Sequence, residues 1–328
     1  MLNAANNFAA TGSATLALDC ASEAQRIQTF LHQAVGRTLS RRGLVVGVSG
    51  GIDSAVCVSL AVRALGPDRV LALLMPEGES SDGSLIRGRR LCEKLGVQAV
   101  VEDISSTLAA AGCYERRDQA IRQLFPAYGA GWRQKIVISG QGRLPYFTLV
   151  VESPSGERQA KRMPLEVYLQ VVAATNYKQR VRKMTEYYHA DRLNYAVIGT
   201  PNRLEYELGF FVRGGDGLAD VKPIAHLYKS QVYAMAAHLG VTEEIRRQLP
   251  STDTYSLPQD QEEFYFALPY EQADVLLHAM NNGQSPAEAA ARLGLQTEMV
   301  EHVFKDFTGK RRLADRLLLD ALTLHEGA

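Results

Sequence analysis

The sequence predicts an α/β protein built on a doubly wound, mostly parallel sheet with helices on both faces, a Rossmann-like architecture that carries a β-rich insertion. Three runs, at 43–48, 68–76 and 195–200, are apolar at nearly every position, which is typical of strands buried on both faces, and a further strand is predicted at 97–104. Helical patterns separate these runs, and strand–helix–strand alternation is the pattern of a doubly wound sheet. The four predicted strands are "GLVVGV" (43–48), "DRVLALLMP" (68–76), "VQAVVEDI" (97–104) and "YAVIGT" (195–200).

The segments between these strands carry apolar residues at helical spacing, three or four positions apart. The stretch 165–194 has the same spacing, and we expect its helix to be broken around Thr175 and Asn176. The other predicted helices of this region cover 21–41, 53–66, 82–96 and 227–240.

Residues 114–166 interrupt the alternation. Their alternating β-formers, punctuated by Gly and Pro, predict two or three antiparallel strands, with a turn at "SPSG" (153–156). From residue 284 onward the pattern predicts two short helices. Ser285 would cap the first of them, with Pro286 at its first helical position.

These patterns divide the chain into parts. Residues 1–20 read as a loose N-terminal leader and not as a signal peptide, because they have neither a charged start nor a long apolar core. We expect the main domain to cover 21–275, with the β-rich insertion inside it at about 114–166. Residues 276–328 would form a C-terminal helical extension. Every apolar run falls short of the ~20 residues that a membrane span needs.

The composition argues against several classes of protein. Lys plus Arg and Asp plus Glu both number 36, so the net charge is zero, whereas nucleic-acid binders usually carry a basic excess. Cys20, Cys57, Cys92 and Cys113 form no CxxC pair. This spacing disfavours a zinc site or a disulfide framework and fits the reducing cytoplasm, where we expect the protein to be located.

The stretch "LVVGVSGGIDSAV" (44–56) places a glycine-rich turn between a buried strand and a helix. Such turns bind anions, because glycines allow close approach and the helix start presents N–H groups. Ser49 and Ser54 can donate to phosphate, whereas Asp53 would repel it unless a cation lies between them. The pattern therefore indicates Mg²⁺ bridging carboxylate and phosphate. A plain strand–helix turn with Asp53 as a helix-capping acid remains the alternative at this point.

The whole string "SGGIDS" after "VVGV" resembles the pyrophosphate-binding loop of the ATP pyrophosphatase superfamily. The stretch 197–232, "VIGTPNRLEYELGFFVRGGDGLADVKPIAHLYKSQV", is similar to the pattern of the ammonia-dependent NAD synthetases within that superfamily. Segments 174–184 and 248–274 resemble further motifs of the same family. The resemblance covers roughly 20–110 and 165–275, so it implies that 21–275 is an ATP pyrophosphatase domain.

The resemblance implies a role for each matching residue. Asp53 and Glu205 would ligate Mg²⁺, and Lys229 would neutralise triphosphate charge, which makes these three the catalytic set. Residues implied to bind ATP are Gly47, Ser49, Gly50, Gly51, Asp53, Ser54, Thr200, Lys229 and Ser251. Residues implied to contact the dinucleotide substrate are Arg180, Asp216 and Lys222, with Asp220 shaping the same loop.

The implied reaction has two steps. The carboxylate of deamido-NAD attacks the α-phosphate of ATP and gives an acyl adenylate and pyrophosphate; ammonia then attacks the acyl carbon and releases AMP. The resemblance also implies Mg²⁺ as the cofactor and a homodimer as the assembly. No Cys-His pair with recognisable spacing predicts a glutaminase, so we expect free ammonia or ammonia from a separate partner.

Three alternatives stay open from the sequence. Arg203, "RGGDGLAD" (213–220) and the aromatics of 248–274 depart from the family pattern near the substrate, so a related amide ligase could adenylate another carboxylate. A tRNA-modifying enzyme and a non-catalytic nucleotide sensor are the other two. The insertion could be a lid, a dimer contact, a docking surface or a plain surface addition.

Overall fold

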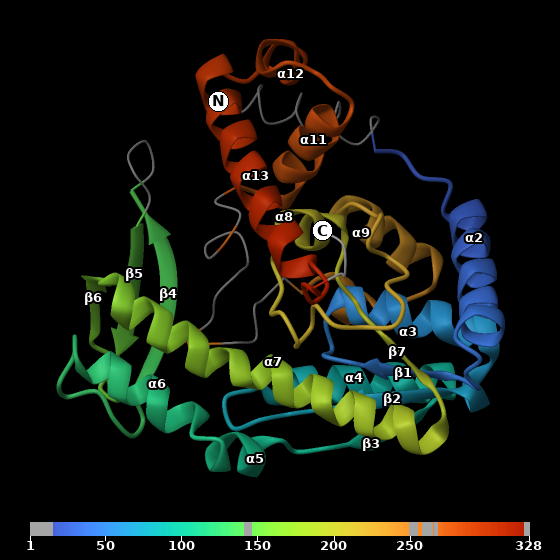
Figure 1. Ribbon diagram of the computed structural model, residues 1–328, viewed down its shortest axis with the longest axis horizontal. Coiled ribbons are helices and arrows are strands. Elements are labelled where there is room, and N and C mark those ends of the chain that lie inside the picture. Colours follow the sequence, from blue (N-terminus) through green and yellow to red (C-terminus); the bar gives the residue numbers. More distant parts are fainter. Residues whose placement is uncertain (1–15, 141–145, 249–254, 258–264, 266–267, 325–328) are drawn as a thin grey trace.

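The computed structural model describes residues 16–140, 146–248, 255–257, 265 and 268–324. Its central sheet has four parallel strands in the order β3-β2-β1-β7 (Figure 1). The predicted doubly wound sheet is therefore confirmed. Its strands are β1 (Leu44–Gly47), β2 (Val70–Leu74), β3 (Gln98–Val101) and β7 (Ala196–Ile198).

Helices cover both faces of this sheet. Alternate strand residues point to opposite sides, so apolar side chains need covering on each face. Val46 and Ala72 face the larger core, whereas Val45 and Leu73 face the second one. The larger core is closed by α2 (Cys20–Gln33), α3 (Ile52–Leu65), α4 (Asp82–Leu95) and α9 (Lys229–His238); α7 (Leu165–Leu193) covers the other face.

The N-terminal prediction is tested only from residue 16 onward, since 1–15 lie outside the described residues. Leu16 is already buried, and α2 begins at Cys20 after the Asp19 side chain, which accepts hydrogen bonds from the N–H groups of Ala21 and Ser22. A π-helical turn, η1 (Ala34–Thr38), continues α2, so the helical segment ends slightly before the predicted residue 41.

The expected break at Thr175 and Asn176 is wrong. Helix α7 runs unbroken through both residues for 29 residues. The Thr175 hydroxyl donates to the Val171 carbonyl at 2.7 Å, which satisfies its polar group inside the helix. The first turns of α7 pack in the core of the insertion and its last turns pack on the central sheet, so burial at both ends supports one straight helix.

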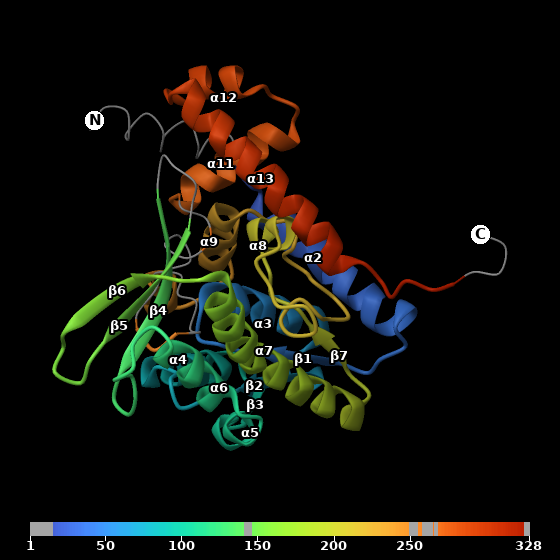
Figure 2. The same cartoon turned by 60° about the vertical axis from the view of Figure 1, so that its left-hand side comes forward.

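The insertion forms a second, separate sheet of three antiparallel strands in the order β4-β5-β6 (Figure 2). Its strands are β4 (Arg133–Ser139), β5 (Tyr146–Glu152) and β6 (Arg158–Arg162). The predicted turn is confirmed, since Gly156 N donates to Ser153 O at 2.9 Å. The first part of the predicted insertion is helical and not β-rich, since α6 (Cys113–Arg122) follows the short α5 (Ser105–Ala110). The buried, helically spaced Cys113, Arg117, Ala120 and Ile121 explain this helix.

Helices dominate the C-terminal part. Ser285 caps its helix as predicted and forms a reciprocal capping box with Glu288. The last helix is long and not short, with 22 residues and a buried row at Val300, Phe307 and Ala314. The expected boundary at 275–276 falls inside a helix, so the domain limits stay a prediction. These helices are α11 (Tyr270–Asn281), α12 (Pro286–Leu293) and α13 (Thr297–Leu318).

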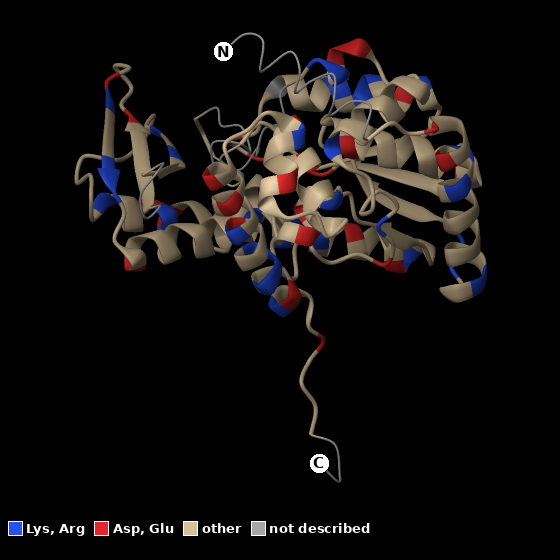
Figure 3. Ribbon diagram, turned by 90° about the horizontal axis from the view of Figure 1, so that it is seen from above, with Lys and Arg blue, Asp and Glu red and all other residues tan. Residues whose placement is uncertain are grey.

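Three short helices complete the described part: η2 (Pro67–Arg69), α8 (Arg203–Leu208) and α10 (Glu243–Arg246). Figure 3 shows acidic and basic residues distributed along the ribbon. Among the described residues, no helix combines the length and apolar character that crossing a membrane requires.

Candidate active site

The glycine-rich turn lies between β1 and α3, at the carboxyl edge of the central sheet. Gly50 has φ +78°, and a Cβ there would lie 2.3 Å from the Ser84 carbonyl oxygen, so only glycine fits. The hydroxyls of Ser49 and Ser54 lie 3.1 Å apart, and Ser49 Oγ accepts from Gly51 N at 3.2 Å. The turn is thus a rigid loop at a helix start, the geometry that binds anions.

Asp53, in the first turn of α3, forms an ion pair with Lys229, the first residue of α9. Lys229 Nζ lies 2.5 Å from Asp53 Oδ2, and the lysine side chain is only 1% exposed. Burial opposes the charged ammonium, but the carboxylates of Asp53 and Glu205 outweigh it and raise the pKa of Lys229. A charged lysine is therefore fixed directly beside the anion-binding turn.

Glu205 reaches the same place from α8. Asn202 caps that helix: its side chain accepts from Glu205 N at 3.2 Å and donates to Asp53 Oδ1 at 3.1 Å. Glu205 Oε2 in turn accepts from Asn202 N at 3.1 Å. Burial, followed by the charge of Asp53, raises the pKa of Glu205 to about 8, although Lys229 partly offsets both. Two carboxylates thus face one ammonium in a buried setting.

This donor set fits one divalent cation in the company of phosphate. With both carboxylates ionised, the group would carry one negative charge more than Lys229 offsets. Burial, followed by this excess charge, raises the pKa of Glu205, and a bound cation would neutralise that charge. Within the described residues, no group of three or more His, Cys, Asp or Glu side chains is placed to hold a metal. Mg²⁺ commonly uses one or two carboxylates and completes its shell with water and substrate phosphates.

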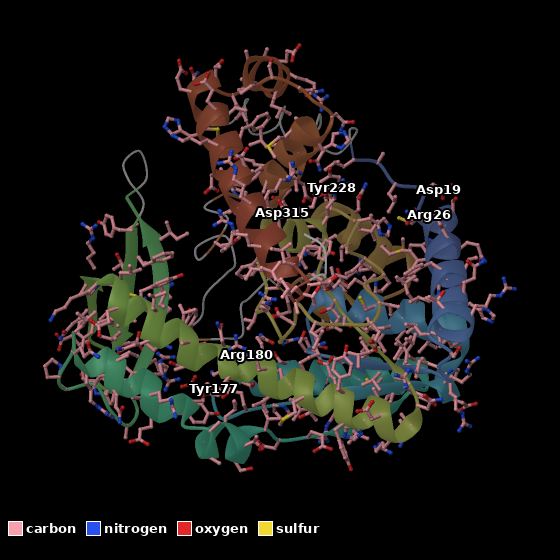
Figure 4. The ribbon with its side chains drawn as sticks, viewed as in Figure 1. Asp19, Arg26, Tyr177, Arg180, Tyr228 and Asp315 are labelled. Carbon is pink, nitrogen blue, oxygen red and sulfur yellow. The ribbon has the colours of Figure 1, made fainter. Side chains whose placement is uncertain are left out.

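A cavity of about 1030 Å³ opens over the carboxyl edge of the sheet. Most of the predicted site residues lie on its wall, including Thr200 just after β7 and Arg180. Figure 4 shows Arg180 on α7. Arg180 Nε donates to the Arg213 carbonyl at 3.3 Å, and Asp216 Oδ1 accepts from Val212 N at 2.8 Å. The predicted residues that line the cavity are Gly47, Ser49, Gly50, Gly51, Asp53, Ser54, Arg180, Thr200, Glu205, Asp216 and Lys229.

Two of the residues implied for the substrate lie off the cavity wall. Asp220 Oδ2 accepts from Val197 N at 2.7 Å, so its carboxylate shapes the loop, and it does not line the cavity. Lys222 also lies off the cavity wall, with its Nζ 4.9 Å from the centre of the Tyr206 ring. Burial, followed by the charge of Lys183, lowers the pKa of Lys222. Ser251 lies outside the described residues.

Comparison with known proteins decides the family. The model of the NAD synthase family matches residues 23–125 and 155–312, which is most of the chain. The chain belongs to the NAD synthase family. This family consists of ATP-dependent, amide-forming ligases that act on small-molecule substrates, so the chain is a ligase of NAD biosynthesis.

Similar proteins cover nearly the whole chain. An NH(3)-dependent NAD(+) synthetase from Rhizobium rhizogenes is 54% identical over 317 residues, which is 95% of each chain. One from Rhizobium meliloti is 58% identical over 302 residues, covering 91% of this chain and 90% of that protein. Both relatives carry the function that the sequence motifs predicted for this NAD synthase family member.

Two solved structures share the fold. The NMN synthetase from Francisella tularensis has a TM-score of 0.64 at 22% identity, covering 94% of this chain and 99% of its own. The NH3-dependent NAD synthetase from Campylobacter jejuni has a TM-score of 0.62 at 22% identity, covering 94% and 100%. At such low identity these likenesses support the NAD synthase fold alone.

Several residues on the cavity or behind it were not predicted. Asn202 had a readable signal, because "NRLE" is a capping-box pattern at a helix start. Arg87 Nη2 donates to Ser84 Oγ at 3.1 Å beside the glycine-rich turn. Lys183 and Glu186 form a buried pair at 2.6 Å, and Glu186 occupies the space that a Cβ on Gly47 would need. The positions of Arg87, Lys183 and Glu186 at the cavity follow only from contacts between distant segments of the chain.

Asp274 of α11 was also missed, and it fixes the start of α9. Its two carboxylate oxygens accept from Lys229 N at 3.1 Å and from Ser230 N at 2.7 Å. Burial raises the pKa of Asp274 to about 6, although the two backbone hydrogen bonds partly oppose this. The buried carboxyl of Asp274 therefore positions Lys229, the predicted catalytic lysine, through the backbone at the start of α9.

A buried ionic cluster holds the β2–α4 connection, whose Ser80 and Ser81 line the cavity. Lys178 Nζ lies 2.8 Å from Glu77 Oε1 and 2.6 Å from Glu79 Oε2, and its side chain is 1% exposed. Arg117 and Tyr114 complete the cluster, at 2.6 Å from Glu79 and 2.7 Å from Glu77. The connection is thereby fixed against α6 and α7.

Proposed function

We propose that this member of the NAD synthase family is an ammonia-dependent NAD synthetase. It converts deamido-NAD, ATP and ammonia to NAD, AMP and pyrophosphate through an acyl adenylate. One observation carries the proposal: Asp53, Glu205 and Lys229 meet beside a glycine-rich turn at the start of α3. This set can hold a divalent cation and a triphosphate together, which adenylation of a carboxylate requires.

The chain's own groups bind and orient ATP in this proposal. The N–H groups at the start of α3 and the hydroxyls of Ser49 and Ser54 donate to the β- and γ-phosphates. Thr200 contacts the nucleotide at the end of β7, and Ser251 keeps its role on the sequence motif alone. Lys229 Nζ can donate to a phosphate oxygen instead of to Asp53. It then stabilises the charge on the departing pyrophosphate.

Mg²⁺ is the proposed cofactor, held by Asp53 and Glu205. When bound, it would neutralise phosphate charge and polarise the α-phosphate. Asn202 fixes the distance between the two carboxylates, because it bonds Asp53 and caps the helix that carries Glu205. Lys229 and Glu205 are buried, so their charges act more strongly than they would in water.

The dinucleotide is proposed to lie along the cavity from Arg180 to Asp216. Arg180 can pair with its pyrophosphate, and the Asp216 carboxylate faces the same space. Lys222 would need to turn from the Tyr206 ring to reach it, whereas Asp220 acts by shaping the loop. The positions of Arg180 and Asp216 hold the carboxylate next to the α-phosphate and supply proximity as the main catalytic factor.

We also propose a homodimer in the cytoplasm that takes free ammonia or ammonia from a separate protein. Helix α7 offers a surface for the second copy, since Leu165, Leu169, Met184 and Tyr188 are each more than half exposed. A monomer by light scattering at assay concentration would remove the dimer from the proposal. The balanced charge of the chain supports small-molecule substrates over nucleic acid.

The proposal is tested by pyrophosphate release from Mg-ATP and ammonium, with and without deamido-NAD, together with detection of NAD. We expect release to depend on deamido-NAD and NAD to form. Asp53→Asn and Glu205→Gln should each lower kcat at least about 100-fold. Glu93→Gln, an exposed acid on α4, is the matched control and should keep activity. ATP cleavage that ignores deamido-NAD but responds to another carboxylate would replace the substrate in this proposal.

A further inference from the structure

The insertion contributes two strands to the wall of the cavity. The family model leaves residues 126–154 unmatched, and this gap contains all of β4 and β5. Ile138 and Ser139 from β4 and Tyr146 and Phe147 from β5 nevertheless line the same cavity as Asp53. A segment outside the family pattern therefore shapes the site where the family chemistry takes place.

The insertion is firmly held in this position. Ile136, Leu149 and Val151 are fully buried and pack with Val167 and Val171 at the start of α7. These strand residues form the inner face of the small sheet, and α7 continues from there to the central sheet (Figure 1). Because this wall is already held in place, binding of a ligand would not carry the entropy cost of ordering it.

The segment 255–257 adds a second anchor. Gln134 N donates to Ser256 Oγ at 2.9 Å, and Leu257 N donates to Gln134 O at 3.0 Å. Tyr255 is buried and also lines the cavity. The β4 strand thus holds neighbouring parts of the cavity wall in place.

The inner row of the small sheet continues beyond its core into the cavity. Ile138 and Phe147 are cross-strand partners in this row, whereas the next pair, Ser139 and Tyr146, points to the opposite face, where the Arg162 guanidinium lies over the Tyr146 ring. The Phe147 ring stacks on Tyr168 of α7, with centroids 4.0 Å apart and planes 11° apart. This end of the cavity is aromatic, while the end near the glycine-rich turn carries charged groups such as Arg87, Arg182 and Lys183.

We propose that Phe147 and Tyr168, with Ile138, form a subsite that binds the flat heteroaromatic ring of a substrate nucleotide by stacking. A nucleotide has charged phosphates at one end and a planar ring at the other, and the cavity has the same division. Aromatic side chains bind such rings through their faces and tolerate different bases. The proposal rests on the proposed function for its choice of nucleotide. The ring belongs either to ATP or to the dinucleotide.

The test compares Phe147→Leu and Tyr168→Leu with the wild-type protein. Both variants keep an apolar side chain and remove the aromatic face. We expect the KM for one nucleotide, ATP or deamido-NAD, to rise about tenfold or more, with kcat within about twofold. Phe147→Tyr, which retains the ring, should stay near wild type. The nucleotide whose KM changes identifies the source of the ring.

Phe125→Leu is the matched control, because Phe125 belongs to the same buried cluster but does not line the cavity. It should lower the melting temperature without changing either KM. Unchanged KM values for both nucleotides in both leucine variants of the wall, Phe147→Leu and Tyr168→Leu, would overturn the proposal.

Calorimetric binding of Mg-ATP and of deamido-NAD to the full chain separates this inference from the proposed function. If the wild type makes no NAD but Phe147→Leu weakens binding of a nucleotide at least about fivefold, the function fails and the subsite stands. If NAD forms and neither nucleotide binds more weakly to the variant, the function stands and the subsite fails. A wild type that binds neither nucleotide overturns both.

Discussion

Asn202 donates a hydrogen bond of 3.1 Å from its side-chain amide to Asp53 Oδ1, and this bond joins the first turn of α3 to the start of α8. The same side chain accepts from Glu205 N at 3.2 Å. Asn202 is completely buried, so neither bond competes with water. One amide therefore sets the separation of the two carboxylates that would hold the metal.

Asn202→Ala removes this link and the helix cap. We expect the free energy of unfolding to fall by about 1–2 kcal/mol, as for other caps. The Mg²⁺ concentration for half-maximal activity should rise as well, because the two carboxylates lose their common support. The measurements are denaturant unfolding and a Mg²⁺ titration of pyrophosphate release.

Ser285→Ala is the matched control, since Ser285 forms the equivalent capping box with Glu288 on α12 and does not line the cavity. It should cost similar stability and leave the Mg²⁺ dependence unchanged. Equal Mg²⁺ curves for the two variants would show that Asn202 acts only as a cap.

Lys229→Met removes the buried ammonium from between Asp53 and Glu205. We expect kcat to fall about 100-fold or more, because the pyrophosphate charge loses a preorganised partner. Lys94→Met tests lysine loss elsewhere: Lys94 Nζ bonds the Gly240 carbonyl at 2.6 Å, away from the cavity. Comparable activity in the two variants, measured by pyrophosphate release, would contradict the proposed role.

The sequence predicts β1, β2 and β7 well because strands buried on both faces need continuous apolar runs, which are visible without tertiary information; β3, at the edge of the sheet, is largely exposed. The glycine-rich turn is visible for a related reason: Gly50 meets a local steric demand that only glycine satisfies. Thr175 shows where local reasoning fails. We expected a break there, but the Val171 carbonyl satisfies the Thr175 hydroxyl and packing at both ends keeps α7 helical.

The rest of the site depends on contacts between distant segments. Asp274 lies 45 residues from Lys229 in sequence, and nothing local shows that its carboxyl meets the start of α9. The pair of Lys183 and Glu186 is visible as an i,i+3 pattern, but its burial beneath Gly47 is not. Lys222 shows the opposite case. It matches a family motif in the sequence, but its side chain does not line the cavity.

Asp274 gives the stability of the fold a defined pH dependence. Burial raises the pKa of its carboxyl from an ordinary value near 3.8 to about 6, so the folded state binds this proton more tightly than the unfolded state. The group's contribution to the free energy of unfolding is therefore greatest at low pH and is lost as pH rises through 6. The loss is about 2 kcal/mol between pH 4 and pH 7.

Asp274→Asn removes this titration while keeping the side-chain size. We expect the variant to gain stability relative to wild type by about 2 kcal/mol between pH 4 and pH 7. Its absolute stability should still be lower near pH 4, since the amide can accept only one of the two backbone hydrogen bonds. The measurement is urea unfolding of both proteins at each pH. If the free energies of unfolding change in parallel with pH, the raised pKa of Asp274 is contradicted.

Gly50→Ala and Gly66→Ala separate backbone strain from a steric clash. Both glycines have positive φ, at +78° and +80°, so alanine is strained at either position by about 1–3 kcal/mol. Only at Gly50 would the new Cβ meet another atom, the Ser84 carbonyl oxygen at 2.3 Å; at Gly66 the space is open. Gly50→Ala must therefore push α4 away from the turn or distort the turn itself. We expect the KM for ATP to rise at least about tenfold in Gly50→Ala alone, because the loop N–H groups lose their alignment on the phosphates. An equal, small effect of both substitutions on stability and on the KM for ATP would show that the turn tolerates a side chain and does not need its close contact with Ser84.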